Sequence, residues 1–197
     1  MKNENSSERS DSLDNGEGSY RRFLDGDNNG LAEIIKEYKD GLTFYLVGFV
    51  KDFDTAEELT QETFVRLFVR KPRFSGKSQF KTWLYSIGRH IAYDYLRKNK
   101  KQLQAVQPEE RDIPDEALSP ETVYFNNERS FALYRGMQRL SGDYYRVLWL
   151  TYFENMSNKE TAELMKKSLG STQVLLTRAR AALKAELEKE GFTDENL

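Results

Sequence analysis

Apolar residues recur every three to four positions along most of this chain, the period of helices that are buried on one face. The first half predicts helices at about 29–50, 54–70 and 80–100. Asp54 can cap the free amides of the second helix, with Glu57 at the spacing of a capping box, and Pro72 lies just beyond its end. The residues expected on the buried face of this second helix are Ala56, Leu59, Thr63, Phe64, Leu67 and Phe68.

The second half of the chain predicts four shorter helices, at about 124–140, 143–153, 158–165 and 169–189. Ser157 and Glu160 have the spacing of a capping box, and Ser168 is a suitable cap for the last helix. Trp149 lies in the apolar run VLWLTYF and is expected in the core of this half.

The segments between and around these helices are polar. We expect a disordered tail at 1–27, a flexible acidic linker at 102–123, which holds three of the four prolines, and a short tail at 191–197. No strand-like alternation is present. The predicted fold class is therefore all-α, with two small helical domains at 28–101 and 124–190, the second a four-helix domain with a helix-turn-helix.

The net charge of −2 hides an uneven distribution of charged residues. Between residues 63 and 101 there are eleven basic residues and one acid, and acidic segments lie on both sides. A short charged run is usually only a solvated surface. A basic segment of this length between acidic ones indicates a surface that binds a polyanion such as nucleic acid.

Basic and aromatic residues alternate every four positions along the helix at 80–100, as Lys81, Tyr85, Arg89, Tyr93 and Arg97. Such residues form one slowly winding stripe. Cations can neutralise phosphates and rings can stack on unpaired bases, so the stripe suits separated DNA strands. An ordinary exposed face with partly buried tyrosines explains the stripe alone equally well.

The loop at 72–79 precedes this helix and adds Arg73, Phe74 and Lys77, which favour the DNA-binding interpretation. An aromatic residue beside the small residues Ser75 and Gly76 could form a pocket for a flipped base. The last two predicted helices have the spacing of a helix-turn-helix, whose second helix enters the major groove. By spacing alone this second signal is weak, because short helices also meet this way in other bundles.

Several motifs occur in the order and at the spacing of a known family: AEELTQETF at 56–64, FSG at 74–76, FKTWL at 80–84 and DYLRK at 94–98. They resemble region two of extracytoplasmic-function (ECF) RNA polymerase sigma factors. Region four of the same family is similar to residues 140–183. The resemblance implies a protein that binds core RNA polymerase and directs it to promoter DNA.

The resemblance also implies roles for particular residues. The acidic helix would dock on the coiled coil of the largest polymerase subunit through Glu57, Glu58, Gln61 and Glu62, although Glu57 could equally belong to the helix cap. Residues expected to melt and hold the −10 element are Arg73, Phe74, Lys77, Lys81, Tyr85, Arg89, Tyr93, Arg97 and Lys98. Residues expected to contact the −35 element are Ser168, Ser171, Gln173, Thr177 and Arg178.

The last helix departs from the family pattern. Family members commonly carry Gly-Thr-Val-Lys-Ser-Arg there, whereas residues 170–175 of this chain are Gly-Ser-Thr-Gln-Val-Leu. Gln173 and Leu175 thus replace two expected cations, which predicts weaker −35 binding or an altered base preference. Gln173 can still make a bidentate contact to adenine.

The remaining features restrict the functional class. The chain has no cysteine, one histidine, no phosphate-binding Gly-Lys-Ser/Thr loop and no HExxH motif, so we expect no enzyme activity, no metal and no cofactor. The absence of a long apolar run or a secretory signal predicts a cytoplasmic protein without membrane insertion. The expected partners are core RNA polymerase, promoter DNA and, from the family resemblance, an anti-sigma factor.

Two other interpretations remain open at this level. A stand-alone transcription regulator would use only the helix-turn-helix at 124–190. A sigma-like decoy would bind a protein partner without opening DNA, and the loss of cations at Gln173 and Leu175 favours it.

Overall fold

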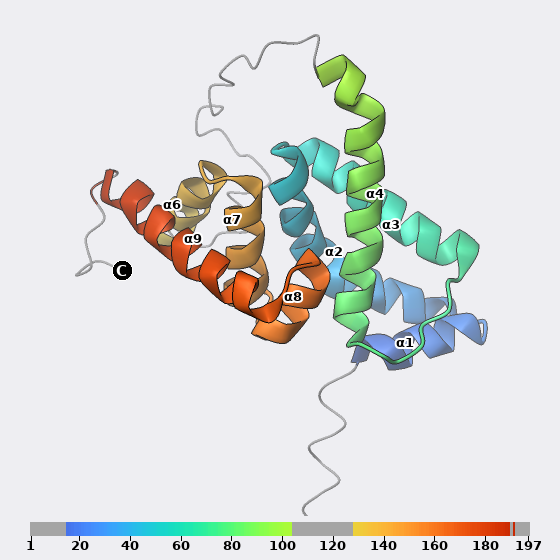
Figure 1. Cartoon of the computed structure of the whole chain (residues 1–197). Helices are drawn as coiled ribbons and strands as arrows, with labels where there is room; N and C mark the ends of the chain where they lie inside the picture. Colours follow the sequence, from blue (N-terminus) through green and yellow to red (C-terminus); the bar gives the residue numbers. More distant parts are fainter. Residues whose placement is uncertain (1–14, 104–127, 190, 192–197) are drawn as a thin grey trace, which may run out of the picture. The chain divides into compact units, whose positions relative to one another are not determined.

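A computed structural model describes residues 15–103, 128–189 and 191 of the chain (Figure 1). Every regular element in these ranges is a helix, which confirms the predicted fold class. The described helices fall into two compact units: α1, α2, α3 and α4 as far as Tyr93 form the first, and α6 to α9 belong to the second. Most of the predicted linker at 102–123 lies outside the described residues.

The first unit contains α1 (Asn15–Leu24), α2 (Asn28–Val50), α3 (Phe53–Arg70) and the part of α4 (Phe80–Leu103) that precedes residue 94. α2 and α3 each end in a residue with left-handed backbone geometry, Lys51 and Lys71. The first residue of α4 was placed correctly from the sequence.

The prediction of a disordered tail at 1–27 is wrong for its second part, because α1 begins at Asn15. Tyr20 and Phe23 of this helix are buried, and their apolar contacts offset the entropy lost when the segment becomes ordered. The first 14 residues lie outside the described residues.

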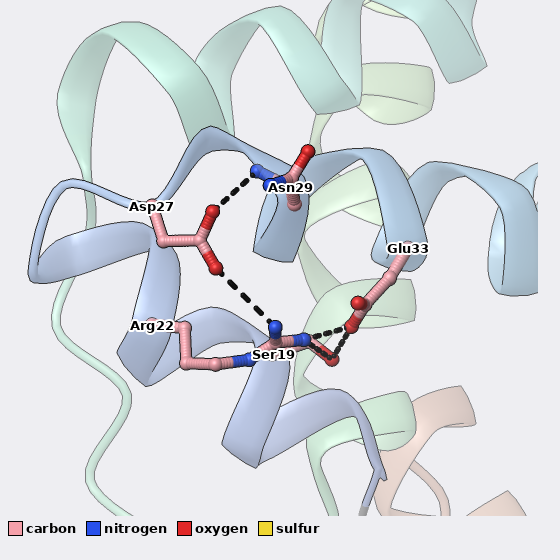
Figure 2. A network of polar contacts seen from close by, with 5 residues as sticks. All are labelled: Ser19, Arg22, Asp27, Asn29 and Glu33. Atoms are coloured by element: carbon pink, nitrogen blue, oxygen red, sulfur yellow. Dashed lines mark hydrogen bonds and ion pairs between the residues drawn. The ribbon is translucent and has the colours of Figure 1, made fainter.

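Polar contacts fix α1 to the start of α2 (Figure 2). Ser19 donates a hydrogen bond of 2.7 Å to Glu33, and Arg22 forms ion pairs with both Glu33 and Asp27. Asp27 also caps α2 by accepting a 3.0 Å bond from the amide of Asn29. The hydrogen bond from Arg22 lowers the pKa of Glu33, so this carboxylate stays ionised at neutral pH.

The start of α3 differs from its prediction by one residue. Its cap is Asp52, whose carboxylate accepts from the amide of Thr55 at 2.9 Å, and not Asp54. Glu57 does not close a capping box; it forms an ion pair of 2.7 Å with Lys39 of α2. Phe53 in the first turn packs against Phe44 of α2, which favours the earlier start.

The core of the first unit forms where α2, α3 and α4 approach closely. Gly88 of α4 makes this approach possible, because a Cβ there would lie 3.0 Å from Leu42 and 3.4 Å from the hydroxyl of Thr63. Thr43 and Thr60 join α2 to α3 by a buried hydrogen bond of 3.0 Å.

The second unit contains α6 (Glu128–Gln138), α7 (Gly142–Leu148), a π-helical turn η1 (Trp149–Phe153), α8 (Asn158–Met165) and α9 (Leu169–Lys189). Trp149 is fully buried, as predicted. Its ring stacks between Tyr145 and Phe153, at centroid distances of 6.3 and 4.4 Å. Leu176 and Ala179 of α9 are also buried, and α9 packs against α7, the helix that carries Tyr145.

Candidate nucleic-acid interface

The predicted polymerase-binding residues of α3 point in two directions. Glu58, Gln61 and Glu62 are exposed, and Glu62 forms an ion pair with Arg66 at 3.0 Å. Glu57 points toward Lys39 and is half-buried. Three of the four predicted polymerase-binding residues therefore share an accessible face, and Glu57 stabilises the contact between α2 and α3.

Large apolar residues extend this exposed face of α3. Val65, Phe68 and Val69 are exposed, and Phe68 retains 53 % of its accessible surface although the sequence placed it in the core. Phe68 contacts Phe23 of α1 with one side of its ring, at a centroid distance of 6.0 Å. The spacing 65, 68 and 69 is that of a second apolar stripe, a signal that could have found these residues. Exposed apolar groups that adjoin each other favour a protein partner.

The predicted stripe on α4 is interrupted at Tyr85. This side chain is fully buried and packs on Tyr45 of α2 at 5.4 Å, so it cannot stack on DNA. Four residues of a helix turn through about 400°, and each step therefore moves the stripe about 40° around α4. The winding places Tyr85 against α2, while Tyr93 and Arg97 are exposed.

Arg89, Tyr93 and Arg97 of the stripe, together with the adjacent Lys98, form a cationic and aromatic ridge, a name used below for these four residues. The guanidinium of Arg89 lies 4.7 Å from the centroid of the Tyr93 ring, a cation–π contact that leaves Tyr93 exposed. Arg97 forms an ion pair with Asp94 at 3.0 Å. Lys81, one end of the predicted stripe, is half-buried.

The loop at 71–79 presents Arg73 and Lys77 to solvent, as predicted. Phe74 is half-buried, because its ring packs on Phe80 at 5.6 Å and on Trp83 at 5.2 Å. Gly76 has a φ of 67°, which favours glycine at this point of the loop. The loop therefore joins exposed cations to an anchored ring.

α8 and α9 have the geometry predicted for a helix-turn-helix. Ser157 and Glu160 form the capping box of α8, and Lys166 ends the helix in left-handed geometry. Ser168 caps α9 by accepting a 3.1 Å bond from the amide of Ser171. The residues of α9 and its cap predicted to contact DNA are all exposed: Ser168, Ser171, Gln173, Thr177 and Arg178.

The turn between α8 and α9 is attached to α7 through Asp143. This carboxylate forms an ion pair of 3.1 Å with Lys167 and another with Arg146. Burial raises the pKa of Asp143, but the hydrogen bond from Lys167 and the charge of Arg146 outweigh that effect, and the pKa is lowered overall. The ion pair between Lys167 and Asp143 holds Lys167 next to α7.

Two exposed apolar residues of α9 were not among those predicted from the sequence to contact DNA. Leu169 and Val174 are exposed, and Val174 lies on the side of the helix opposite the buried Thr172, Leu176 and Ala179. The exposed side of α9 borders a shallow groove, which is lined by Tyr144, Gly170, Ser171, Val174, Leu175 and Arg178. Arg180 packs over the ring of Tyr152, at 5.3 Å from its centroid, a contact that indicates a structural role for this arginine.

Neither a metal site nor a membrane-spanning helix is found among the residues that the structure describes. No group of three or more histidine, cysteine, aspartate or glutamate residues could hold a metal ion there. Among the same residues, no helix has the length and apolar character needed to cross a membrane.

Comparison with known proteins identifies two regions of one family. Residues 34–102 match the model of sigma-70 region 2, and residues 130–183 match that of sigma-70 region 4. The chain is 28 % identical over 159 residues to the ECF RNA polymerase sigma factor SigX of Bacillus subtilis, covering 79 % of this chain and 82 % of SigX. It is 29 % identical over 165 residues to SigM of the same organism, covering 84 % of this chain and 99 % of SigM.

The fold has a counterpart among solved structures. The sigma factor RpoE of Bartonella quintana, solved in complex with the anti-sigma factor NepR, superposes with a TM-score of 0.64 at 22 % identity, over 80 % of this chain and 96 % of RpoE. The two family models together match more than half of the chain, in the order in which the motifs predicted them. The chain therefore belongs to the sigma-70 family of RNA polymerase sigma factors, as a member of its ECF type, and directs the initiation of transcription.

Proposed function

We propose that this sigma factor binds core RNA polymerase through the exposed face of α3, holds the melted −10 element on α4 and the preceding loop, and contacts the −35 element with α9. The ridge of Arg89, Tyr93, Arg97 and Lys98 carries the proposal, because it combines accessible positive charge with an accessible ring. The protein would act in the cytoplasm by binding alone, without catalysing a reaction.

The exposed face of α3 suits a protein partner rather than DNA. Glu58 and Glu62 would repel phosphates, whereas Val65 and Phe68 offer apolar surface one and two turns farther along. Interfaces commonly combine an apolar centre with a charged rim. A partner with apolar and basic side chains would complement this face, and the proposed partner is the coiled coil of the largest polymerase subunit.

The ridge on α4 suits DNA whose strands have separated. Stacking on an exposed ring requires a base that has left the duplex, and Tyr93 offers such a ring between two arginines. Arg73 and Lys77 of the loop would add phosphate contacts, and the partly covered Phe74 would border a flipped base. Tyr85 is excluded from this role by its burial.

A protein inhibitor is a further proposed partner. RpoE of Bartonella quintana was solved with the anti-sigma factor NepR, and CnrH, 19 % identical with a TM-score of 0.61, with the cytosolic domain of CnrY. Both comparisons cover most of this chain. We propose that an anti-sigma factor covers the exposed faces of this protein until a signal releases it.

Run-off transcription with the full chain and core polymerase tests the function. The expected result is a promoter-dependent product that core polymerase alone does not make. Capture of polymerase without any opened promoter would support the decoy instead. Binding of duplex DNA without affinity for polymerase would support the stand-alone regulator, and either result would overturn the proposal.

Reversing the charge of Glu62 is expected to weaken polymerase binding about tenfold, because Glu62→Lys places a cation at the rim of the proposed interface. Affinity for core polymerase, measured by fluorescence anisotropy, checks this expectation. Glu37→Lys is the matched control, since it makes the same charge change at an exposed position of α2. Equal affinities of the two variants would place the polymerase interface elsewhere.

Val174 is expected to contact the methyl group of a thymine in the −35 element. It is 51 % exposed and lies opposite the buried side of α9, near the end that would enter the major groove. Apolar side chains distinguish thymine by its methyl group, whose burial contributes roughly 0.8 kcal/mol, about fourfold in affinity.

Replacing −35 thymines with uracil, one at a time, should therefore weaken binding of the wild-type holoenzyme about fourfold at one position. Val174→Ser should abolish this sensitivity, because its side chain buries less apolar surface. Ala181→Ser, which also introduces a hydroxyl at an exposed position of the same helix, is the control that should keep it. Uracil sensitivity that survives in Val174→Ser would contradict this assignment.

A further inference from the structure

The loop at 71–79 is held at its start by α1. The hydroxyl of Tyr20 donates a 2.6 Å hydrogen bond to the carbonyl oxygen of Pro72, across 52 positions of sequence. The ammonium group of Lys71 lies 4.7 Å from the centroid of the Phe23 ring, so a second residue of α1 contacts the same end of the loop.

The same helix also contacts the other end of the loop. The ring of Tyr20 packs on Phe80 at 5.6 Å and on Trp83 at 5.2 Å, in the first turn of α4. Gly16 allows the close approach, because a Cβ at this position would lie 2.3 Å from the Phe80 ring. Phe80 and Trp83 are the two rings on which Phe74 of the loop rests.

α1 is itself a firm support for these contacts. The network of Ser19, Arg22 and Glu33 ties it to α2 (Figure 2). Gly30 of α2 lies so close to α1 that a Cβ there would be 2.2 Å from the carbonyl oxygen of Ser19. Tyr20 is 1 % exposed, and burial raises its pKa to about 12, so its hydroxyl remains a donor at neutral pH.

The loop between these attachments has no regular structure. Residues 73–79 lie outside the helices, so no helix or sheet hydrogen bonds restrict the conformation of this segment. Arg73 and Lys77 are exposed, and the chain turns at Gly76. Capture of a flipped base requires a pocket of defined shape, and a mobile loop would have to lose conformational entropy on binding. Attachments that fix both ends of the loop in advance reduce this cost.

We infer that Tyr20 is a positioning residue for base recognition: by bonding to Pro72 and supporting Phe80 and Trp83, it sets the shape of the loop that would hold a flipped −10 base. The inference rests on the proposed function of the loop. It assigns a role in DNA specificity to a helix that lies outside both matched family regions.

The test compares Tyr20→Phe with wild type in full-length holoenzyme on forked promoter DNA. The unpaired bases of the −10 element are replaced one at a time, and the ratio of affinities for native and replaced base is measured at each position. Tyr20→Phe keeps the ring and removes only the donor. We expect the largest ratio to fall about fivefold, the equivalent of one neutral hydrogen bond, while affinity for core polymerase stays within about twofold.

Tyr45→Phe is the matched control, since it also removes a buried tyrosine hydroxyl from the first unit. The Tyr45 ring packs on Phe49 and Tyr85, which are not residues of the loop. It should leave every ratio unchanged. Hydrogen exchange on the full chain supplies a second measurement: amides of residues 73–79 should exchange faster in Tyr20→Phe than in Tyr45→Phe, with no change in α2.

The outcomes separate this inference from the proposed function. A uniform loss of affinity with unchanged ratios would mean that Tyr20 only stabilises the fold, and would overturn the inference while the proposed function stands. A wild-type holoenzyme that shows no base preference in the unpaired −10 strand would overturn the proposed role of the loop, and the inference with it.

Discussion

Replacing Lys81, Arg89 and Arg97 together with glutamine is expected to lower promoter opening roughly a hundredfold and to reduce the salt dependence of DNA binding by a slope of about 2 to 3. Each cation along α4 that neutralises a phosphate releases counterions, and three lost contacts remove that contribution. Arg89 also holds the Tyr93 ring at 4.7 Å, so its loss should weaken base stacking as well. Permanganate footprinting of unpaired thymines measures opening, and titration of promoter DNA with holoenzyme at several salt concentrations measures the slope.

The control for this variant keeps the change in net charge and moves it away from these three residues of α4. Lys36 on α2 and Lys184 and Lys189 near the end of α9 are all exposed. Their joint replacement with glutamine should leave opening within about threefold of wild type, since only long-range charge effects, which salt screens, are altered. Opening that survives in the first variant would show that α4 does not hold the separated strands.

Trp149→Ala is expected to destabilise the second unit by about 3 to 5 kcal/mol, enough to unfold a marginally stable domain. Trp149 is fully buried and stacks on both Tyr145 and Phe153, so its removal leaves a cavity between two rings. Holoenzyme formed with this variant should lose its dependence on the −35 sequence, because α9 loses its support. Chemical denaturation and transcription from −35 mutant promoters measure the two effects.

Tyr152→Ala is the matched control for this loss. Tyr152 belongs to the same π-helical turn but is half exposed, with Arg180 packed over its ring. Its replacement should cost no more than about 1 kcal/mol, the order of an exposed cation–π contact. A Trp149→Ala variant as stable as Tyr152→Ala would show that the stacked rings do not hold the second unit together.

Features that depend on neighbouring residues could be predicted from the sequence. The capping box of Ser157 and Glu160 and the cap at Ser168 both follow from side chains within a few positions. The cluster of positive charge at 63–101 is also a property of sequence alone, and so are the motifs that identify both sigma regions.

Features that depend on residues far away along the chain could not be predicted from the sequence. Tyr20 and Phe23 are two aromatic residues in a polar segment, and nothing nearby shows that Pro72, Phe80 and Phe68 will cover them. This is why α1 was mistaken for a disordered tail. Phe68 was misplaced for a different reason: residues 65, 68 and 69 form a second apolar stripe on α3, and Phe68 was assigned to the first.

Helix periods, caps and motifs are local patterns, so the amino-acid sequence is enough to establish that the chain is helical, that it carries the two sigma regions and where positive charge gathers. Which aromatic residues are available to ligands depends instead on how the helices pack. Tyr85 and Tyr93 lie two turns apart on one predicted stripe, yet Tyr85 packs on Tyr45 and Tyr93 is exposed. A stripe that winds around a helix faces the neighbouring helix at one residue and solvent a few residues later. The packing of α2 against α4 determines which residue of the stripe is buried.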